Sequence, residues 1–472
     1  MLAGYAEVLY LQARDAEGGR VAEEALAVAR SVGARWEEGR ALGLVGVKLA
    51  DLGDLDGGLA LLREARRIAE EQADVEGLAM AHVMMTWGTF DAGRLEEGLA
   101  AALDGAEATG RLGSPGWRDF LEQLAAQFEF PLGRWEEADR HLRAVLERDQ
   151  LTGPKGVHTR WQRARLDIAR GDFAAARRWL QEAEQQAATA SRAQFDAQFA
   201  GPLATARAEL ALWEGRDHDA FQASTEGLTA LAHTVADEGA DSVLFALGLA
   251  AAANKAERAS ARRATNQAED ARRDGDQLLA RLQALADAHT SFAMTPAVLA
   301  QCRAEHSRLH GHPNPTGWAA TAAEWEALGQ PYPAACAHWR EAEALLATRA
   351  SKARTEQVLG AAYAVAVRLG ATPLRRELEL LAQRGRARLE PPARPVVEPE
   401  APSAAASLGL TTREAEVLAL LAEGRTNRQI GETLFITPKT ASVHVSRILA
   451  KLGVAGRGEA AAVAHRLGLD KP

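Results

Sequence analysis

Apolar side chains recur along the first part of the chain with a period of about forty residues. Each copy is marked by a glycine with a large apolar residue two positions later, at Gly53, Gly93, Gly133 and Gly171. Counted from this glycine, positions 5, 9 and 12 hold small or aliphatic residues in every copy. The spacings of 3, 4 and 3 put positions 2, 5, 9 and 12 on one helical face. Each copy therefore predicts a helix, a tight turn at the glycine and a second helix with one buried face.

Small residues at position 5 predict that the two helices of a pair approach each other closely. The four copies have, at this position, Gly58, Gly98, Ala138 and Ala176. A fifth copy at Gly215 is degraded, because Asp217 stands where the apolar residue is expected. Residues 20–31 resemble the second helix of a pair whose first helix is short or missing, so we expect the chain to begin inside the array.

The second part of the chain keeps its helical pattern but loses the glycine punctuation. Residues 241–310 are rich in alanine and indicate long helices. Helix pairing then returns at 317–328, 333–348, 352–369 and 372–387. Residues 391–407 are rich in proline, alanine and serine, which predicts a semi-extended linker. We thus expect an all-α chain with a solenoid of helix pairs at 1–390, this linker, and a further domain at 408–472.

Residues 408–472 predict four short helices with their own start and stop signals. The start signals are two capping boxes and a proline at the first helical position, namely Thr411 with Glu414, Thr426 with Gln429, and Thr437 before Pro438. Gly453 and Gly468 are expected to end the third and the fourth helix, the fourth beginning near Arg457. Such short helices need a shared core, for which the candidates are Leu418, Leu421, Ile430, Leu434, Val445, Ile448 and Leu452.

The third of these helices has two faces of different chemistry. The inner face is apolar and consists of Ala441, Val445, Ile448, Leu449 and Leu452. The outer face has two cations, a hydroxyl and an exposed valine but no acid, and consists of Lys439, Val443, Ser446, Arg447 and Ala450. A structural surface helix would more often expose Glu–Lys pairs. Small polar groups, cations and a branched methyl side chain suit the major groove of DNA.

Composition and charge agree with this division. The chain carries a net charge of −9, but residues 408–472 hold nine Lys/Arg and six Asp/Glu, which leaves +3 there and −12 elsewhere. A basic module on an acidic scaffold is typical of a DNA-binding protein. Two cysteines, no apolar run of about 20 residues and no basic leader predict a cytoplasmic protein that contacts no membrane.

The C-terminal segment resembles the LuxR-type helix-turn-helix family over residues 408–469. The matching residues are Leu410, Thr411, Arg413, Glu414, Glu416, Val417, Leu418, Leu421, Ala422, Gly424, Asn427, Ile430, Leu434, Thr440, His444, Ile448, Lys451, Leu452, Gly453, Val454, Arg457, Glu459 and Ala460. The resemblance implies a bacterial-type regulator that binds double-stranded DNA as a homodimer.

The same resemblance implies which side chains meet DNA. The phosphate contacts would come from Thr426, Asn427, Arg428, Thr437, Thr440 and Lys451, to which we add the outer-face cations Lys439 and Arg447. The residues expected at base edges are Ser442, Val443 and Ser446. Ala441 and Ser442 replace the commoner Val-Lys of the family. Without the long lysine side chain, we expect base recognition to depend on short side chains and on DNA shape.

The array resembles tetratricopeptide repeats and, less specifically, the helical arm of the large ATP-binding LuxR-type regulators. The latter resemblance rests on the repeat spacing and the segment WEALGQPYPAACAHWREAEALL. No lysine follows a glycine, so no P-loop is present and we expect neither ATPase activity nor a cofactor. The chain is then either a truncated relative or one whose ATPase is on another polypeptide.

Cys302, His306 and His310 are spaced i, i+4 and i+8, which is compatible with a zinc site on one helical face. A buried cysteine beside exposed histidines accounts for this spacing equally well, so we expect no metal. No catalytic constellation is present either, and we expect a transcription regulator, not an enzyme. Its array would sense a protein partner or a small effector. The alternatives are a protein-interaction scaffold and a regulatory subunit acting with a separate P-loop ATPase.

Overall fold

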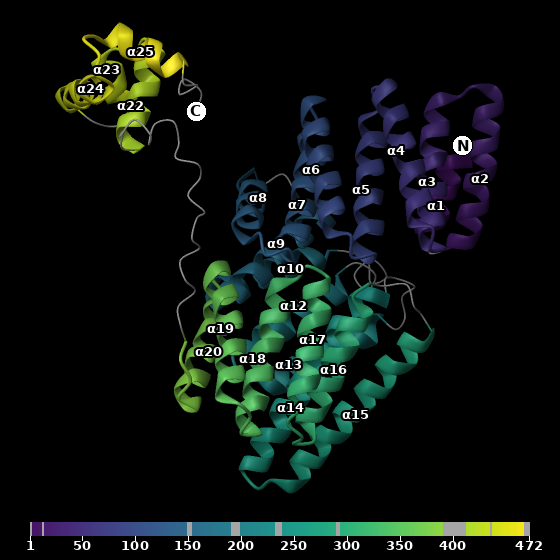
Figure 1. The fold of residues 1–472 in the computed structure, drawn as a ribbon. Helices are drawn as coiled ribbons and strands as arrows, with labels where there is room; N and C mark the ends of the chain where they lie inside the picture. Colours follow the sequence, from purple (N-terminus) through teal and green to yellow (C-terminus); the bar gives the residue numbers. More distant parts are fainter. Residues whose placement is uncertain are drawn as a thin grey trace. The chain divides into compact units, whose positions relative to one another are not determined.

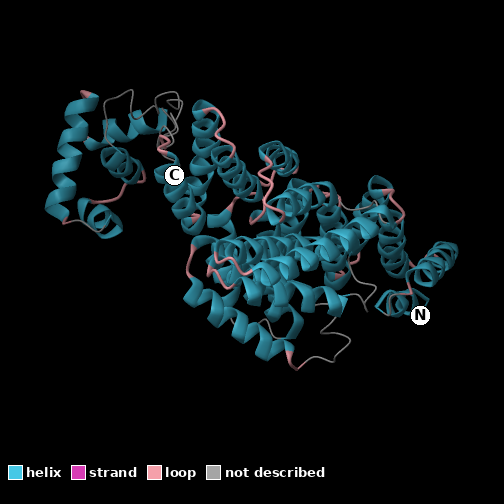
Figure 2. Cartoon of the chain, turned by 90° about the horizontal axis from the view of Figure 1, so that it is seen from below, coloured by secondary structure: helices cyan, strands magenta, loops and turns pink. Residues whose placement is uncertain are grey.

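The structure is a computed structural model, and it is all helical where it is described (Figures 1 and 2). The described residues are 2–11, 14–148, 153–189, 199–231, 238–288, 293–389, 412–434 and 437–466. They form two compact units, residues 1–391 and residues 392–472. The predicted all-α class is therefore confirmed. None of the described helices combines the length and the apolar composition that crossing a membrane requires.

The first unit is an array of helix pairs (Figure 1). Its first part consists of α1 (Leu2–Leu11), α2 (Asp15–Val32), α3 (Arg35–Asp51), α4 (Leu55–Glu71), α5 (Val75–Asp91), α6 (Leu95–Arg111), α7 (Pro115–Glu129), α8 (Trp135–Arg148), α9 (Gly153–Arg170) and α10 (Phe173–Ala187). The second part consists of α12 (Ala200–Trp213), α13 (Asp217–Leu231), α14 (Glu238–Ala261), α15 (Thr265–Ala288), α16 (Thr295–Leu309), α17 (Pro315–Ala327), α18 (Pro331–Ala347), α19 (Lys352–Leu369) and α20 (Thr372–Gly385). Each of these helices packs on the next, and α1, α3, α5, α7 and α9 also pack on one another in that order.

The glycines that mark the sequence repeat lie in the turns between paired helices. Gly53, Gly93, Gly133 and Gly171 have φ between 69° and 93°, a left-handed conformation that a glycine adopts without strain. The side chains at positions 9 and 12 are buried in every copy, and they are Leu62, Ala65, Ala102, Gly105, Leu142, Val145, Leu180 and Ala183. The predicted helix–turn–helix unit and its buried face are confirmed.

Small residues at position 5 are required by the close approach of paired helices. A Cβ atom on Gly58 of α4 would lie 2.5 Å from the carbonyl oxygen of Gly46 on α3. A Cβ atom on Gly98 of α6 would collide with the ring of Phe128 and the hydroxyl of Thr89, both of which are buried. These contacts leave no volume for a larger side chain.

The degraded fifth copy keeps the same geometry. Gly215 has a φ of 71° and joins α12 to α13. Asp217, which replaces the apolar residue, is buried, and its carboxylate accepts a hydrogen bond from Asn254 Nδ2 at 2.8 Å. Arg258 Nε lies 3.0 Å from the other carboxylate oxygen of Asp217. Polar side chains of α14 therefore provide the partners that the buried Asp217 carboxylate needs. The helix pair forms although the apolar residue expected at this position is absent.

Salt bridges connect successive repeats at equivalent positions. The arginine one residue after the glycine of one copy pairs with the acid three residues after the glycine of the preceding copy. Arg94 Nη1 is 2.5 Å from Asp56 Oδ1, and Arg134 Nη2 is 2.6 Å from Glu96 Oε1. This repetition shows that the electrostatic pattern, like the apolar pattern, follows the repeat.

The second part of the array packs back against turns of the first part. The Ala293 amide donates to the Asp91 carbonyl at 3.0 Å, beside the turn at Gly93. The rings of Trp135 and Tyr332 meet edge to face with centroids 5.1 Å apart. Helices α7, α8 and α9 thus share one buried apolar cluster with α18, α19 and α20. The array closes on itself there, whereas α1–α4 extend away from this closure (Figure 1).

The second unit contains four helices. They are α22 (Thr412–Ala422), α23 (Asn427–Leu434), α24 (Pro438–Leu452) and α25 (Arg457–Arg466). Their buried core consists of Val417, Leu418, Leu421, Ile430, Ala441, Ile448, Ala460 and Ala464. Val445, Leu449 and Leu452 are partly buried against it, as the pattern of the third predicted helix requires. The predicted linker 391–407, Gly468, Thr411 and the Leu434 side chain lie outside the described residues.

Candidate nucleic-acid interface

The turn between α22 and α23 is fixed by a capping box. Thr426 N–H donates to Gln429 Oε1 at 2.9 Å, and Gln429 N–H donates to Thr426 Oγ1 at 3.3 Å. This confirms the second predicted capping box. Arg457 on α25 adds a hydrogen bond from its Nη2 to the Arg425 carbonyl, which attaches α25 to the same turn. The N-terminus of α23 therefore has a defined position relative to α24 and α25.

Helix α24 follows and presents two distinct faces, as predicted. Ala441 and Ile448 are completely buried, while Val443 on the opposite face is 46% exposed. Gly453 has a φ of 65° and lies directly after the last residue of α24. The core contacts of one face thus hold the other face open to solvent along the helix.

The three residues expected at base edges share this open face. Ser442, Val443 and Ser446 are all exposed. Ser446 Oγ donates a hydrogen bond to the Ser442 carbonyl at 3.0 Å, which occupies its hydrogen but leaves its lone pairs available. In this rotamer the Ser446 oxygen suits an amino group of adenine or cytosine in the major groove. The Val443 methyl groups suit a thymine methyl.

The outer-face cations flank these residues. Lys439 lies in the first turn of α24 and Arg447 beside Ser446, and both side chains are exposed. Neither forms a salt bridge with a side chain that the structure describes. Arg428, near the start of α23, is also exposed. These positive charges are exposed to solvent and can attract an anion.

The polar residues expected at phosphates lie at the N-termini of α23 and α24. Thr426 and Thr437 precede these helices, and the positive end of a helix dipole favours an anion there. Asn427 begins α23, and its Oδ1 is buried without a hydrogen-bond partner among the described residues. The backbone of Thr440 lies in the first turn of α24, and its side chain lies outside the described residues.

Lys451 differs from the other predicted phosphate contacts because it already has an anionic partner. Its Nζ lies 2.6 Å from Oε2 of Glu414 on α22. Glu414 is only 4% exposed, whereas the Lys451 side chain is 36% exposed. The sequence predicts Glu414 as part of a helix cap but does not reveal this pair, because the two residues are 37 positions apart. Lys451 therefore compensates a buried carboxylate between α22 and α24 in addition to any role toward DNA.

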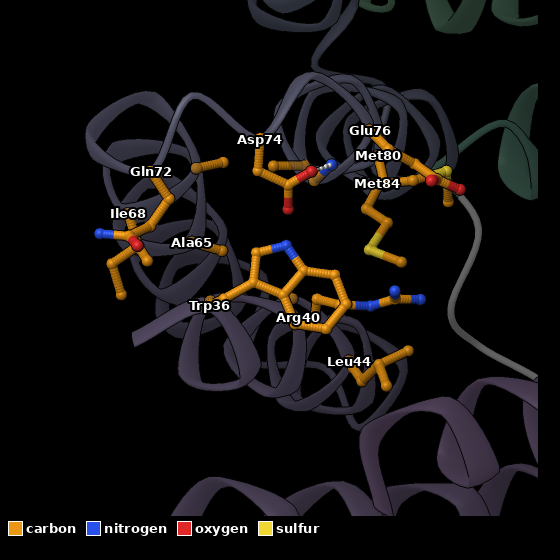
Figure 3. Close-up of a pocket in the computed structure, with 15 residues that line it drawn as sticks. Trp36, Arg40, Leu44, Ala65, Ile68, Gln72, Asp74, Glu76, Met80 and Met84 are labelled. Atoms are coloured by element: carbon orange, nitrogen blue, oxygen red, sulfur yellow. Dashed lines mark hydrogen bonds between the residues drawn. The ribbon is translucent and has the colours of Figure 1, made fainter. Parts of the chain in front are cut away.

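A groove in the first unit is the candidate site for the predicted partner or effector (Figure 3). It lies on α3, α4 and α5, and the indole of Trp36, which is 43% exposed, lies at its centre. The Arg40 guanidinium carbon is 4.9 Å from the centroid of the Trp36 ring. Met80 and Met84 from α5 and the carboxylate of Asp74 face the indole from the other side. A flat aromatic surface beside thioethers and both signs of charge can accept an apolar group that carries a polar end.

Comparisons with known proteins concern the second unit. Residues 408–464 match a family described as bacterial regulatory proteins, luxR family. The chain is similar to the transcriptional regulatory protein LiaR of Bacillus subtilis (strain 168), with 58% identity over 57 residues, which is 12% of this chain and 27% of LiaR. It is similar to the DNA-binding transcriptional activator DevR/DosR of Mycobacterium tuberculosis, with 47% identity over 64 residues, 14% of this chain and 30% of that protein.

A shorter relative is matched over most of its length. The spore germination protein GerE of Bacillus subtilis (strain 168) is 44% identical over 59 residues, which is 12% of this chain and 80% of GerE. The chain thus spans less than a third of LiaR and of DevR/DosR but four fifths of GerE. All three similarities lie within the part of the chain that carries α22–α25 and do not extend over the array.

Proposed function

Because this chain belongs to the luxR family of bacterial regulatory proteins, we propose that it regulates transcription by binding an operator through α24. The observation that carries the proposal is the open face of this helix, where short exposed side chains lie between exposed cations. Ser442, Val443 and Ser446 would contact base edges, and Lys439 and Arg447 would contact phosphates. Residues 408–472 form the DNA-binding domain, 391–407 the linker and 1–390 the array in this proposal.

The phosphate set of the proposal also includes the N-termini of two helices. Thr426, Asn427 and Arg428 would hold one phosphate at the start of α23, and Thr437 and Thr440 another at the start of α24. Lys451 would contribute its charge from beside Glu414. Two copies of the domain would bind two half-sites of one operator, because a single recognition helix covers only a few base pairs.

Genome-wide footprinting of the purified full-length chain tests the proposal. We expect protection at a limited set of related sites, and loss of that protection in the double variant Lys439→Ala, Arg447→Ala. The matched control is Arg111→Ala, which removes an exposed cation of the array whose side chain is 71% exposed. Protection that persists in the double variant, or that the control removes equally, would contradict the assignment of α24 to the groove.

The array is proposed to sense a protein partner or a small effector, and its groove around Trp36 supports this role. Substituting Trp36 with Ala removes the exposed aromatic surface, and we expect this to abolish the response of DNA binding to the effector but not DNA binding itself. If the chain instead acts as a scaffold, no DNA fragment shifts in a mobility assay. If it completes an ATPase on another polypeptide, a P-loop protein co-purifies with it.

A further inference from the structure

Three potential metal ligands converge on the surface where α15 packs against α16. His306 Nε2 is 2.7 Å and His310 Nε2 is 2.8 Å from the same oxygen, Asp276 Oδ1. The two imidazole rings are 4.6 Å apart, centroid to centroid. One ligand atom from each residue lies within 4.8 Å of the others. Both histidines therefore direct their Nε2 atoms at the same oxygen of the Asp276 carboxylate.

The convergence follows from helix geometry and from the packing of two long elements. His306 and His310 are four residues apart at the C-terminal end of α16, so they lie one above the other on one face. Asp276 stands on the adjacent helix α15 and faces this pair. The side chains of all three are accessible from solvent, at 50% for Asp276, 32% for His306 and 31% for His310. An ion can therefore reach the cluster without opening the array.

Cys302, which the sequence spacing grouped with the histidines, is not part of this cluster. Its side chain is completely buried in the apolar core formed with Leu249, Val298 and Leu309. Burial raises the pKa of its thiol well above the usual value, which keeps the sulfur in the protonated form that binds metals poorly. The structure thus replaces the cysteine of the sequence-based candidate with an aspartate from another helix.

We propose that Asp276, His306 and His310 form a binding site for Zn²⁺ or a similar first-row divalent transition ion. Two imidazole nitrogens and one carboxylate oxygen make up a common three-ligand set for zinc, which leaves a further position for water or a ligand. Metal–ligand bonds of about 2.0–2.2 Å would require the two nitrogen–oxygen distances to lengthen by roughly half an ångström, a shift that accessible side chains can make. This revises the expectation of a metal-free chain.

The bound ion would connect two helices of the array that lack the glycine-marked repeat. α15 has 24 residues, and the ion would clamp its middle to the end of α16. Because the ion binds only the folded arrangement of these two helices, it would stabilise the array by an amount that grows with the logarithm of its free concentration above the Kd. The proposal does not depend on the assignment of α24 to DNA.

The test uses the full-length chain without an affinity tag, stripped of metal with a chelator. We expect one Co²⁺ per chain, with visible absorption bands that Zn²⁺ abolishes, and a higher melting temperature of the array in Zn²⁺. Asp276→Asn and His310→Gln should each weaken Zn²⁺ binding by about tenfold or more. The matched control is His312→Gln, which changes an exposed histidine two residues beyond the cluster and should bind Zn²⁺ like the parent.

Two results would overturn the proposal. The first is a parent chain that takes up no Co²⁺ or Zn²⁺ at millimolar concentration, which would show that the three residues form a hydrogen-bonded cluster only. The second is binding that Asp276→Asn and His310→Gln leave unchanged, which would place the ion elsewhere. Because these side chains are accessible to solvent, the variants should retain the circular dichroism spectrum of the parent, and His306→Gln provides an independent third variant.

Discussion

Two cations of the array and two of the DNA-binding unit differ in how their charges are compensated. In the array, Arg94 and Arg134 are held by acids of the preceding repeat, so their charges are compensated where they lie. On α24, Lys439 and Arg447 are exposed and have no acidic partner among the described side chains. The difference teaches that, for these four residues, the count of cations does not separate the two units, whereas the presence or absence of an acidic partner among the described side chains does.

The two units also differ in how their cores are divided. The array contains many separate apolar clusters distributed over its helix pairs, whereas α22–α25 share one cluster. A unit with a single small core loses a large share of its stability when one buried side chain is shortened. The predictions that follow test whether the two units are independent in stability and different in function.

The largest effect is expected from Ile448→Ala in the full-length chain. Ile448 is completely buried in the core of α22–α25, so the change should lower the free energy of unfolding of this unit by about 2–5 kcal/mol. DNA binding should be lost when the unit melts. Differential scanning calorimetry should show that only the transition of the smaller unit moves, with Ala450→Ser on the exposed face as the control. A parallel shift of both transitions would show that the two units fold as one.

The next effect concerns the stability of the array alone. The sequence does not reveal whether a Gly→Ala substitution at position 5 raises or lowers the free energy of unfolding. Replacing a helical glycine with alanine usually stabilises a helix, but Gly98→Ala places a methyl group against Phe128 and Thr89. We expect the array to lose about 1–3 kcal/mol in urea unfolding, with DNA affinity unchanged. Gly360→Ala on α19 is the matched control, because no atom lies within 4 Å of its new Cβ, and it should gain about 0.5–1 kcal/mol. Equal effects of the two substitutions would contradict the close approach described at position 5.

An effect of comparable size is expected on DNA binding by α24. Substitutions at residues assigned to bases should change specificity, and a substitution at a residue assigned to a phosphate should change overall affinity. Val443→Ala or Ser446→Ala should lower affinity for the operator by about 1–3 kcal/mol and leave random-sequence DNA almost unaffected. Arg447→Ala should weaken binding to both DNAs by similar factors and reduce the log–log salt slope by about one unit. Fluorescence anisotropy at several salt concentrations measures both quantities. If Val443→Ala and Arg447→Ala behave alike on both DNAs, the helix does not enter the groove in this orientation.

Lys451→Ala is unsuitable for that comparison, although Lys451 belongs to the same phosphate set. The substitution would leave the Glu414 carboxylate buried without its cation, so the domain should melt at a lower temperature than the parent. A loss of DNA binding in this variant would therefore combine two causes. Arg447, which has no such partner among the described side chains, avoids this ambiguity.

The smallest effect on stability is expected from removing a salt bridge between repeats. Glu96→Gln removes the partner of Arg134 at a site where both side chains are substantially exposed, at 65% and 44%. We expect a loss of less than about 1 kcal/mol that disappears in about 1 M salt. Urea unfolding of the array at low and high salt measures it. A larger loss that persists at high salt would show that these pairs contribute to the packing of neighbouring repeats and not only to their charge balance.

The sequence predicted the features that depend on neighbouring positions. The turn glycines, the buried stripe and the Thr426–Gln429 capping box involve residues a few positions apart, so periodicity and spacing suffice. The two faces of α24 were predicted for the same reason. The degraded copy at Gly215 kept its helix pair because Asn254 and Arg258, some 40 residues away, satisfy Asp217.

Features that depend on distant packing were missed. Asp276 and His306 are 30 positions apart, and only the contact between α15 and α16 brings them together. The Glu414–Lys451 pair spans 37 positions for the same reason. Which residues of the open face touch bases, and where the linker begins and ends, stay predictions. They depend on DNA and on residues outside the described ranges.

The contact between Trp135 and Tyr332 restrains the middle of the array more strongly than its first helices. A repeat protein whose units touch only their neighbours frays from either end, one unit at a time. Here α7, α8 and α9 are held from a second direction by α18, α19 and α20, so the middle of the array can open only if distant segments separate together. The helices α1–α4 have no such restraint among the described residues and can respond unit by unit. The groove around Trp36 therefore lies where α3 and α4, which lack this restraint, meet α5, whose last residue is hydrogen-bonded to the second part of the array.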